Sequence, residues 1–138
     1  MTKFFLSSHG HLASGLKSSL DILLGDSGCV TVFDAYVDER SLEEELNRFY
    51  ETVTPEDQVI LLSDMYGGSV NSIMYTFLDR PNTKLIAGVN LALVIGLVVS
   101  KDMLDDAMIA ELIRQSQEAI RVVELEGQEQ GAEDEELF

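Results

Sequence analysis

The chain has 138 residues, of which 46% are hydrophobic and 25% are charged, a balance typical of one globular domain. Its single cysteine excludes a disulfide framework and a cysteine-rich metal site, which favours a reducing, cytoplasmic compartment. The 25 acidic residues outnumber the 9 basic ones, and the net charge of −16 excludes nucleic acid and anionic membrane surfaces as expected partners.

Short apolar runs alternate with longer amphipathic segments, which predicts alternating strands and helices. Gly25 follows leucines at helical spacing and ends the first helix, and Ser41 with Glu44 forms a capping box that begins the second. Ser69 is the predicted N-cap of the third helix. In chain order, the predicted elements are a strand at residues 3–7, a helix at 13–24, a strand at 29–33, a helix at 41–50, a strand at 58–63, a helix at 69–78, a strand at 84–87, a buried helix at 91–99, an amphipathic helix at 102–119 and a last strand at 120–125.

The C-terminal end of the sequence differs from the body. Residues 127–138 are acidic and uncapped, so we predict a disordered tail that follows one domain of residues 1–126. Residues 120–125 are too apolar for a free tail, and we expect them to pair as a short edge strand, in their own subunit or in a neighbouring one.

The order of the elements predicts an α/β fold. We expect an open, doubly wound sheet of four parallel strands in the order 2-1-3-4, with the short C-terminal edge strand added and helices on both faces. Ligands of such sheets bind beyond the carboxyl ends of the strands, where the strand order reverses. The loops after the first and third strands, which meet there, carry His9 and Asp64.

His9 is the candidate nucleophile. It follows a strand and precedes Gly10, which leaves little bulk beside the imidazole. A neutral imidazole nitrogen can attack phosphorus near neutral pH. An ordinary surface histidine is the competing interpretation, and His11 competes for the same role from the expected start of the helix.

Asp64 and the residues after it are the candidate partners of His9. A carboxylate that accepts the N–H of one ring nitrogen fixes the tautomer and stabilises the charged ring formed after attack. Gly67, Gly68 and Ser69 at a helix start would point backbone N–H groups at phosphoryl oxygens. The competing interpretations are a turn aspartate and an ordinary glycine turn.

Other chemistries lack their sequence patterns. The chain has no Walker lysine motif, no dinucleotide glycine pattern and no Gly-x-Ser-x-Gly elbow. Its two histidines lack the spacing of a helical zinc site. We therefore expect no metal and no cofactor.

Three motifs stand in order after the first, third and fourth predicted strands: Ser8-His9-Gly10, the run from Asp64 to Ser69, and the run from Ile86 to Leu91. Together they resemble the IIA domain of the mannose family of the bacterial phosphoenolpyruvate-dependent sugar phosphotransferase system. The resemblance covers residues 3–125.

The resemblance implies a homodimer that serves sugar uptake as a phosphotransferase. The phosphocarrier protein HPr would phosphorylate His9, and a separate IIB protein would receive the group, with membrane IIC and IID subunits involved indirectly. Asp64 matches the family's histidine-orienting carboxylate, and Gly10, Gly67, Gly68 and Ser69 are the phosphate-binding candidates. His11 replaces an aromatic residue and Val70 a frequent proline, departures that we expect to affect the choice of partner.

Three alternatives to the sugar-transport role stay open. The phosphoryl-donor subunit of dihydroxyacetone kinase shares the fold and the histidine, although the second and third motifs favour the transporter. A receiver-like signalling module needs paired acids where this chain has Ser7-Ser8-His9. A structural or interaction domain would transfer no phosphoryl group.

Overall fold

The computed structural model describes residues 1–100 and 103–126. Its sheet has four parallel strands in the order β2-β1-β3-β4, which confirms the predicted α/β fold and strand order. The strands are β1 (Thr2–His9), β2 (Val30–Ala35), β3 (Gln58–Ser63) and β4 (Thr83–Ala87). The helices are α1 (Leu12–Leu24), α2 (Leu42–Tyr50), α3 (Ser69–Tyr75), α4 (Leu91–Val99) and α5 (Asp106–Glu118).

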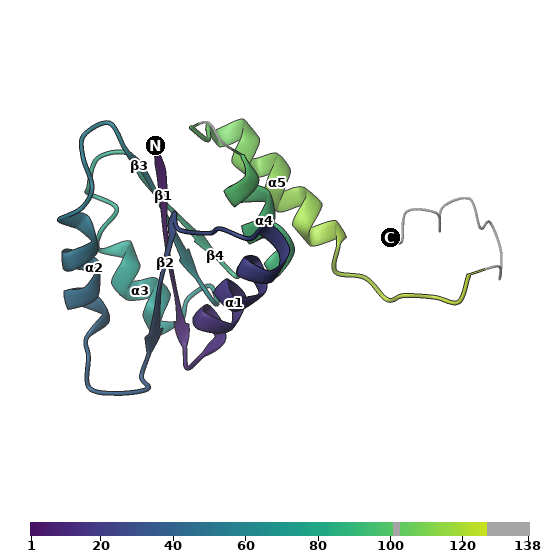
Figure 1. Ribbon diagram of the computed structural model, residues 1–138, viewed down its shortest axis with the longest axis horizontal. Helices are drawn as coiled ribbons and strands as arrows, with labels where there is room; N and C mark the ends of the chain where they lie inside the picture. The colour runs from purple at the N-terminus through teal and green to yellow at the C-terminus, as the bar shows by residue number, and fades with distance from the viewer. Residues whose placement is uncertain (101–102, 127–138) are drawn as a thin grey trace.

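Helices cover both faces of the sheet. In Figure 1, α2 and α3 lie on one side of the strands, and α1, α4 and α5 lie on the other. Successive residues of the central strands point to opposite faces, so Leu6 and Leu62 pack with the α1, α4 and α5 layer while Phe5 and Leu61 pack with α2 and α3. Burial on both sides explains why β3 is continuously apolar.

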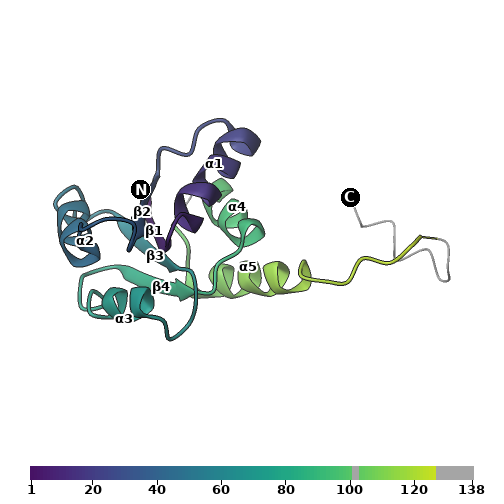
Figure 2. The ribbon, with the colours of Figure 1, turned by 90° about the horizontal axis from the view of Figure 1, so that it is seen from below.

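The register aligns the carboxyl ends of the strands. His9 lies opposite Ala35 of β2, and Ser7 lies opposite Ser63 of β3. The chain leaves β1 through α1 on one face of the sheet and leaves β3 through α3 on the opposite face (Figure 2). The predicted point of reversal between β1 and β3 is therefore present, and His9 stands at it.

Of the two N-caps that the sequence predicted, the structure has one and not the other. Ser41 Oγ accepts the backbone N–H of Glu44 at 3.3 Å, as predicted for α2. At α3, however, Gly68 is the N-cap and Ser69 is the first helical residue, so the prediction of Ser69 as the cap is wrong. The helix also ends at Tyr75, before the predicted residue 78, because the N–H groups of the next residues bond to carbonyls three positions back and tighten the chain into a turn.

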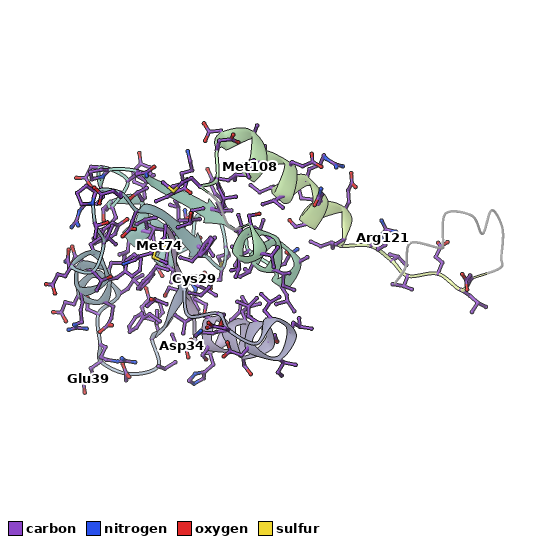
Figure 3. The ribbon with its side chains drawn as sticks, turned by 45° about the horizontal axis from the view of Figure 1, so that its top comes forward. Cys29, Asp34, Glu39, Met74, Met108 and Arg121 are labelled. Atoms are coloured by element: carbon purple, nitrogen blue, oxygen red, sulfur yellow. The ribbon has the colours of Figure 1, made fainter. Side chains whose placement is uncertain are left out.

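The predicted strand at residues 120–125 does not pair with this chain's own sheet. After α5 the chain leaves the body of the molecule, and residues 120–125 form no strand (Figures 1 and 2). Arg121, which lies on this extension, is labelled in Figure 3. The apolar side chains of the segment are exposed: Ile120 73%, Val122 86%, Val123 63% and Leu125 74%. The predicted tail at 127–138 lies outside the described residues.

The helices described at residues 1–100 and 103–126 are all too short or too polar to cross a membrane.

Candidate functional site

His9 and Asp64 meet at the carboxyl edge of the sheet. His9 is the last residue of β1, and Asp64 directly follows β3. Asp64 Oδ2 lies 2.7 Å from His9 Nδ1 and also accepts the backbone N–H of His9 at 2.9 Å. Two contacts to one carboxylate oxygen fix both the ring and the backbone of His9. The structure thus brings together the two residues that the sequence singled out.

The carboxyl group of Asp64 is held in its charged form. Burial raises its pKa, but the hydrogen bonds from the backbone and the ring of His9 outweigh that effect, so the pKa is lowered overall. An ionised carboxylate only accepts hydrogen bonds, so Nδ1 of His9 carries the ring proton. In the neutral imidazole, Nε2 then holds the lone pair. The site has the tautomer that a nucleophilic Nε2 requires.

Ser69 lies on the nucleophilic side of the ring. Its Oγ is 3.2 Å from His9 Nε2, at the first residue of α3. The helix can approach this closely because Gly68 precedes it: a Cβ on Gly68 would lie 2.9 Å from Cγ of Met65 and 3.4 Å from Cε1 of His9. The backbone N–H groups of a first helical turn have no partner within the helix. Nε2 therefore contacts the Ser69 hydroxyl, a possible hydrogen-bond donor to an anion, at the start of this turn.

The loop after β1 turns at Gly10. Its φ of 64° lies in the left-handed region that glycine tolerates. Ser8, buried below the turn, donates from Oγ to the Gly10 carbonyl at 3.1 Å and accepts the backbone N–H of Ala13 at 2.7 Å. These contacts fix the connection between β1 and α1. In the loop after β3, Gly67 also has a positive φ, 81°.

Tyr36 belongs to this site, although the sequence analysis did not identify it. Its hydroxyl lies 2.7 Å from Ser69 Oγ, and its ring lies over His9 with 5.3 Å between ring centroids. Tyr36 directly follows β2, the third strand whose carboxyl end reaches this edge. That position was the only signal in the sequence, since periodicity carries no information on loop residues.

His11 lies outside the site, at the N-cap of α1. Its Nδ1 pairs with Asp34 Oδ2 at 2.9 Å, and its side chain is 77% exposed. Asp34, labelled near α1 in Figure 3, also accepts the backbone N–H and the hydroxyl of Ser14 at 3.0 and 2.7 Å. Burial raises the pKa of Asp34, and the hydrogen bonds from Ser14 and His11 lower it further than burial raises it. His11 thus helps to anchor the start of α1.

Exposed apolar side chains occur at this edge of the sheet, at the start of α1 and in the loops after β2 and β3. They are Leu12, Tyr36, Val37, Met65 and Tyr66. Within the described ranges, no group of three His, Cys, Asp or Glu side chains is arranged as a metal site.

A family model described as the fructose IIA component of the phosphotransferase system (EIIA-man) matches residues 3–117. A solved structure from Klebsiella pneumoniae, described as a phosphoenolpyruvate-dependent sugar phosphotransferase permease, is 31% identical. It covers 88% of this chain and 90% of its own, with a TM-score of 0.79. The chain has no match among the curated protein sequences.

Two more distant structures have the same fold. The mannose/sorbose-specific IIA subunit of Enterococcus faecalis is 24% identical, covers 90% of this chain and 96% of its own, and gives a TM-score of 0.76. The phosphotransferase component EIIA of Streptococcus agalactiae is 22% identical, covers 88% and 97%, and gives a TM-score of 0.75.

Proposed function

Because the chain belongs to the mannose-family IIA components of the sugar phosphotransferase system, we propose that it carries a phosphoryl group on Nε2 of His9 between two partner proteins. The observation that supports this proposal is the His9 ring held between Asp64 and Ser69, at 2.7 and 3.2 Å. One contact directs the lone pair outward, and the other lies on the side from which a phosphoryl group would arrive.

The proposed acceptance step forms one bond and breaks one. The Nε2 lone pair of His9 attacks the phosphorus of a phosphohistidine on the donor. The N–P bond of the donor breaks, and the donor ring, which enters already protonated on its other nitrogen, leaves as neutral imidazole. His9 becomes a phosphorylated imidazolium whose Nδ1–H remains bonded to Asp64, so charge and protons balance without a further base.

Positioning and electrostatics supply the catalysis in this scheme. The carboxylate of Asp64 faces the positive charge that develops on the ring, at 2.7 Å from Nδ1. The Ser69 hydroxyl and the first turn of α3 would face the phosphoryl oxygens, with Gly68 allowing the close approach of this turn to His9. Phosphoryl transfer depends mainly on such placement, because the group passes between partners with little covalent help from the protein.

HPr is the proposed donor and a separate IIB protein the proposed acceptor. The exposed apolar side chains around His9 offer a docking surface for these partners. The net charge of −16 favours partners with basic docking faces, which electrostatic attraction would steer toward this chain.

The test is labelling with radioactive phosphoenolpyruvate in the presence of enzyme I and HPr. We expect one phosphoryl group per chain, mapped to His9, and its loss when a IIB protein is added. Label that passes to a dihydroxyacetone kinase subunit and not to IIB would identify the kinase role instead. A chain that takes no label from phospho-HPr would contradict the proposal.

A further inference from the structure

Tyr36 has a strained backbone at the edge of the site. Its φ of 68° lies in the left-handed region, where residues other than glycine are disfavoured. Such residues persist where the surrounding structure determines their conformation, and they gather at functional sites. Here the strained conformation places the phenol hydroxyl at Ser69 and the ring over His9.

The hydrogen-bond chain that ends at Tyr36 has one consistent direction. Asp64 accepts from Nδ1 of His9, so Nε2 accepts from the Ser69 hydroxyl. Ser69 has one hydroxyl hydrogen, and it points to Nε2. At 2.7 Å, its oxygen must then accept the hydrogen of the Tyr36 hydroxyl. The order of donors is therefore Tyr36 to Ser69 to His9.

From this geometry we propose that Tyr36 is a positioning residue for phosphoryl transfer at His9, an inference that rests on the proposed function. When the Nε2 lone pair attacks phosphorus, the Ser69 hydrogen must leave Nε2, and the phosphoryl oxygens become its nearest acceptors. The bond from Tyr36 keeps the Ser69 oxygen in place during this change. A donor fixed in advance needs no reorganisation as the phosphoryl group arrives.

The ring of Tyr36 has a separate role. Its plane is tilted 35° to the His9 imidazole, with 5.3 Å between centroids, while the His9 side chain remains 43% exposed. The ring covers part of the imidazole and limits the approach of water, the nucleophile that would discharge a phosphohistidine. The hydroxyl and the ring of Tyr36 therefore make different predictions.

Tyr36→Phe tests the hydroxyl. We expect the initial rate of transfer from phospho-HPr to fall roughly two- to tenfold, the effect of one lost hydrogen bond. Adding Tyr36→Phe to Ser69→Ala should slow transfer no further than Ser69→Ala alone, because Tyr36 acts through Ser69. Tyr50→Phe, which removes a tyrosine hydroxyl that bonds Thr83 Oγ1 at 2.9 Å at the other end of the sheet, is the matched control and should transfer at the wild-type rate.

Two further measurements separate a positioning role from a structural one. In nitrogen NMR of the imidazole, the Nε2 resonance of His9 should shift in Tyr36→Phe and in Ser69→Ala, and not in Tyr50→Phe. Tyr36→Gly removes the backbone strain, so its Tm should equal or exceed that of the wild type, while its phosphohistidine should hydrolyse faster than that of Tyr36→Phe.

Two outcomes would overturn the inference about Tyr36. One is a wild-type transfer rate in Tyr36→Phe with an unmoved Nε2 resonance, and the other is an equal loss of rate whether or not Ser69 is present. If the wild-type chain itself takes no label from phospho-HPr, the proposed function fails instead.

Discussion

The two histidines of the chain have similar carboxylate partners and different surroundings at the other ring nitrogen. Nδ1 of His9 lies 2.7 Å from Asp64, and Nδ1 of His11 lies 2.9 Å from Asp34. Nε2 of His9 contacts the hydroxyl of Ser69, the first residue of α3, whereas the His11 side chain is 77% exposed. A carboxylate partner orients both rings, and the groups opposite Nε2 distinguish His9 as the acceptor.

We expect His9→Ala to abolish phosphoryl acceptance and His11→Ala to retain most of it. The first substitution removes the proposed nucleophile, and the second removes a residue that anchors α1 without contacting the site. Label incorporation from phospho-HPr measures both, and circular dichroism serves as the control for folding. Full acceptance by His9→Ala would exclude the mechanism.

We expect Asp64→Asn to keep the fold and slow transfer. The backbone N–H of His9, which now bonds Oδ2, would select the amide oxygen of asparagine for the same position, so the tautomer survives. The charge opposite the developing imidazolium is lost. The rate should fall by less than the order of 10⁴-fold known for loss of an orienting carboxylate in a serine protease. If Asp64→Asn transfers at the wild-type rate in single-turnover measurements, Asp64 has only a structural role in the turn.

The sequence placed His9 and Asp64 at the same edge of the sheet because each lies beside a strongly apolar strand whose end can be located, and the structure has them there; their catalytic roles stay predictions. The sequence did not identify Tyr36, because its position depends on a left-handed φ in a loop. A residue other than glycine gives no sequence signal for that conformation. The cap of α3 was missed by one residue for a related reason: Ser69 is a good N-cap by propensity, but its hydroxyl contacts His9 and Tyr36 instead.

At the scale of elements, Gln58 joins the start of β3 to the segment between α4 and α5. Its side chain is 3% exposed. Nε2 of Gln58 donates to the Leu104 carbonyl at 2.6 Å, and its Oε1 accepts the Leu104 N–H at 2.8 Å. The backbone N–H and carbonyl of the buried Leu104 are thus both hydrogen-bonded to the side-chain amide of Gln58.

We expect Gln58→Leu to destabilise the protein although it adds an apolar side chain to the interior. The N–H and carbonyl of Leu104 would lose their partners, and each unsatisfied buried group costs about 1–3 kcal/mol. Chemical denaturation measures the loss, with Gln117→Leu on the exposed face of α5 as the control. Equal free energies of unfolding for the two variants would show that water replaces the Gln58 amide at no cost.

The predicted elements differ from the structure mainly at their ends. Hydrophobic periodicity locates the interior of a helix or strand, whereas the ends depend on local hydrogen bonds such as the tightened turn after Tyr75. At α5 the helix begins at Asp106, four residues after the predicted residue 102, because Asp105 is the N-cap and accepts the N–H of Met108 at 2.8 Å. These shifts leave the strand order unchanged.

At the scale of the whole molecule, the apolar segment after α5 has no packing partner among the described residues of a single chain. The side chains of Ile120, Val122 and Leu125 are 73%, 86% and 74% exposed. The sequence predicted a strand there, and this prediction fails within the single chain because α5 directs residues 120–125 away from the sheet (Figure 2). Strand formation needs a partner edge, and sequence periodicity does not say which chain supplies it.

We predict that residues 120–125 pair with a second copy of the chain in a homodimer. Among the described residues, β4 is bonded to β3 alone, so its other edge is open to an added strand. A groove lined by Tyr75, Leu85 and Ala87 runs beside it and offers apolar contact. An exchange related by two-fold symmetry would bury both segments and both edges together.

The mass in solution of the full chain and of a chain ending at residue 119 tests the dimer. Truncation removes the apolar segment and leaves α5 intact, since that helix ends at Glu118. We expect a dimer for the full chain and a monomer for the truncated one. Val122→Asp and Val123→Asp test the same segment without shortening the chain. Each places a charge in the pairing segment and should weaken the dimer as well. A monomeric full chain, or a truncated chain that dimerises equally well, would show that this segment does not form the interface.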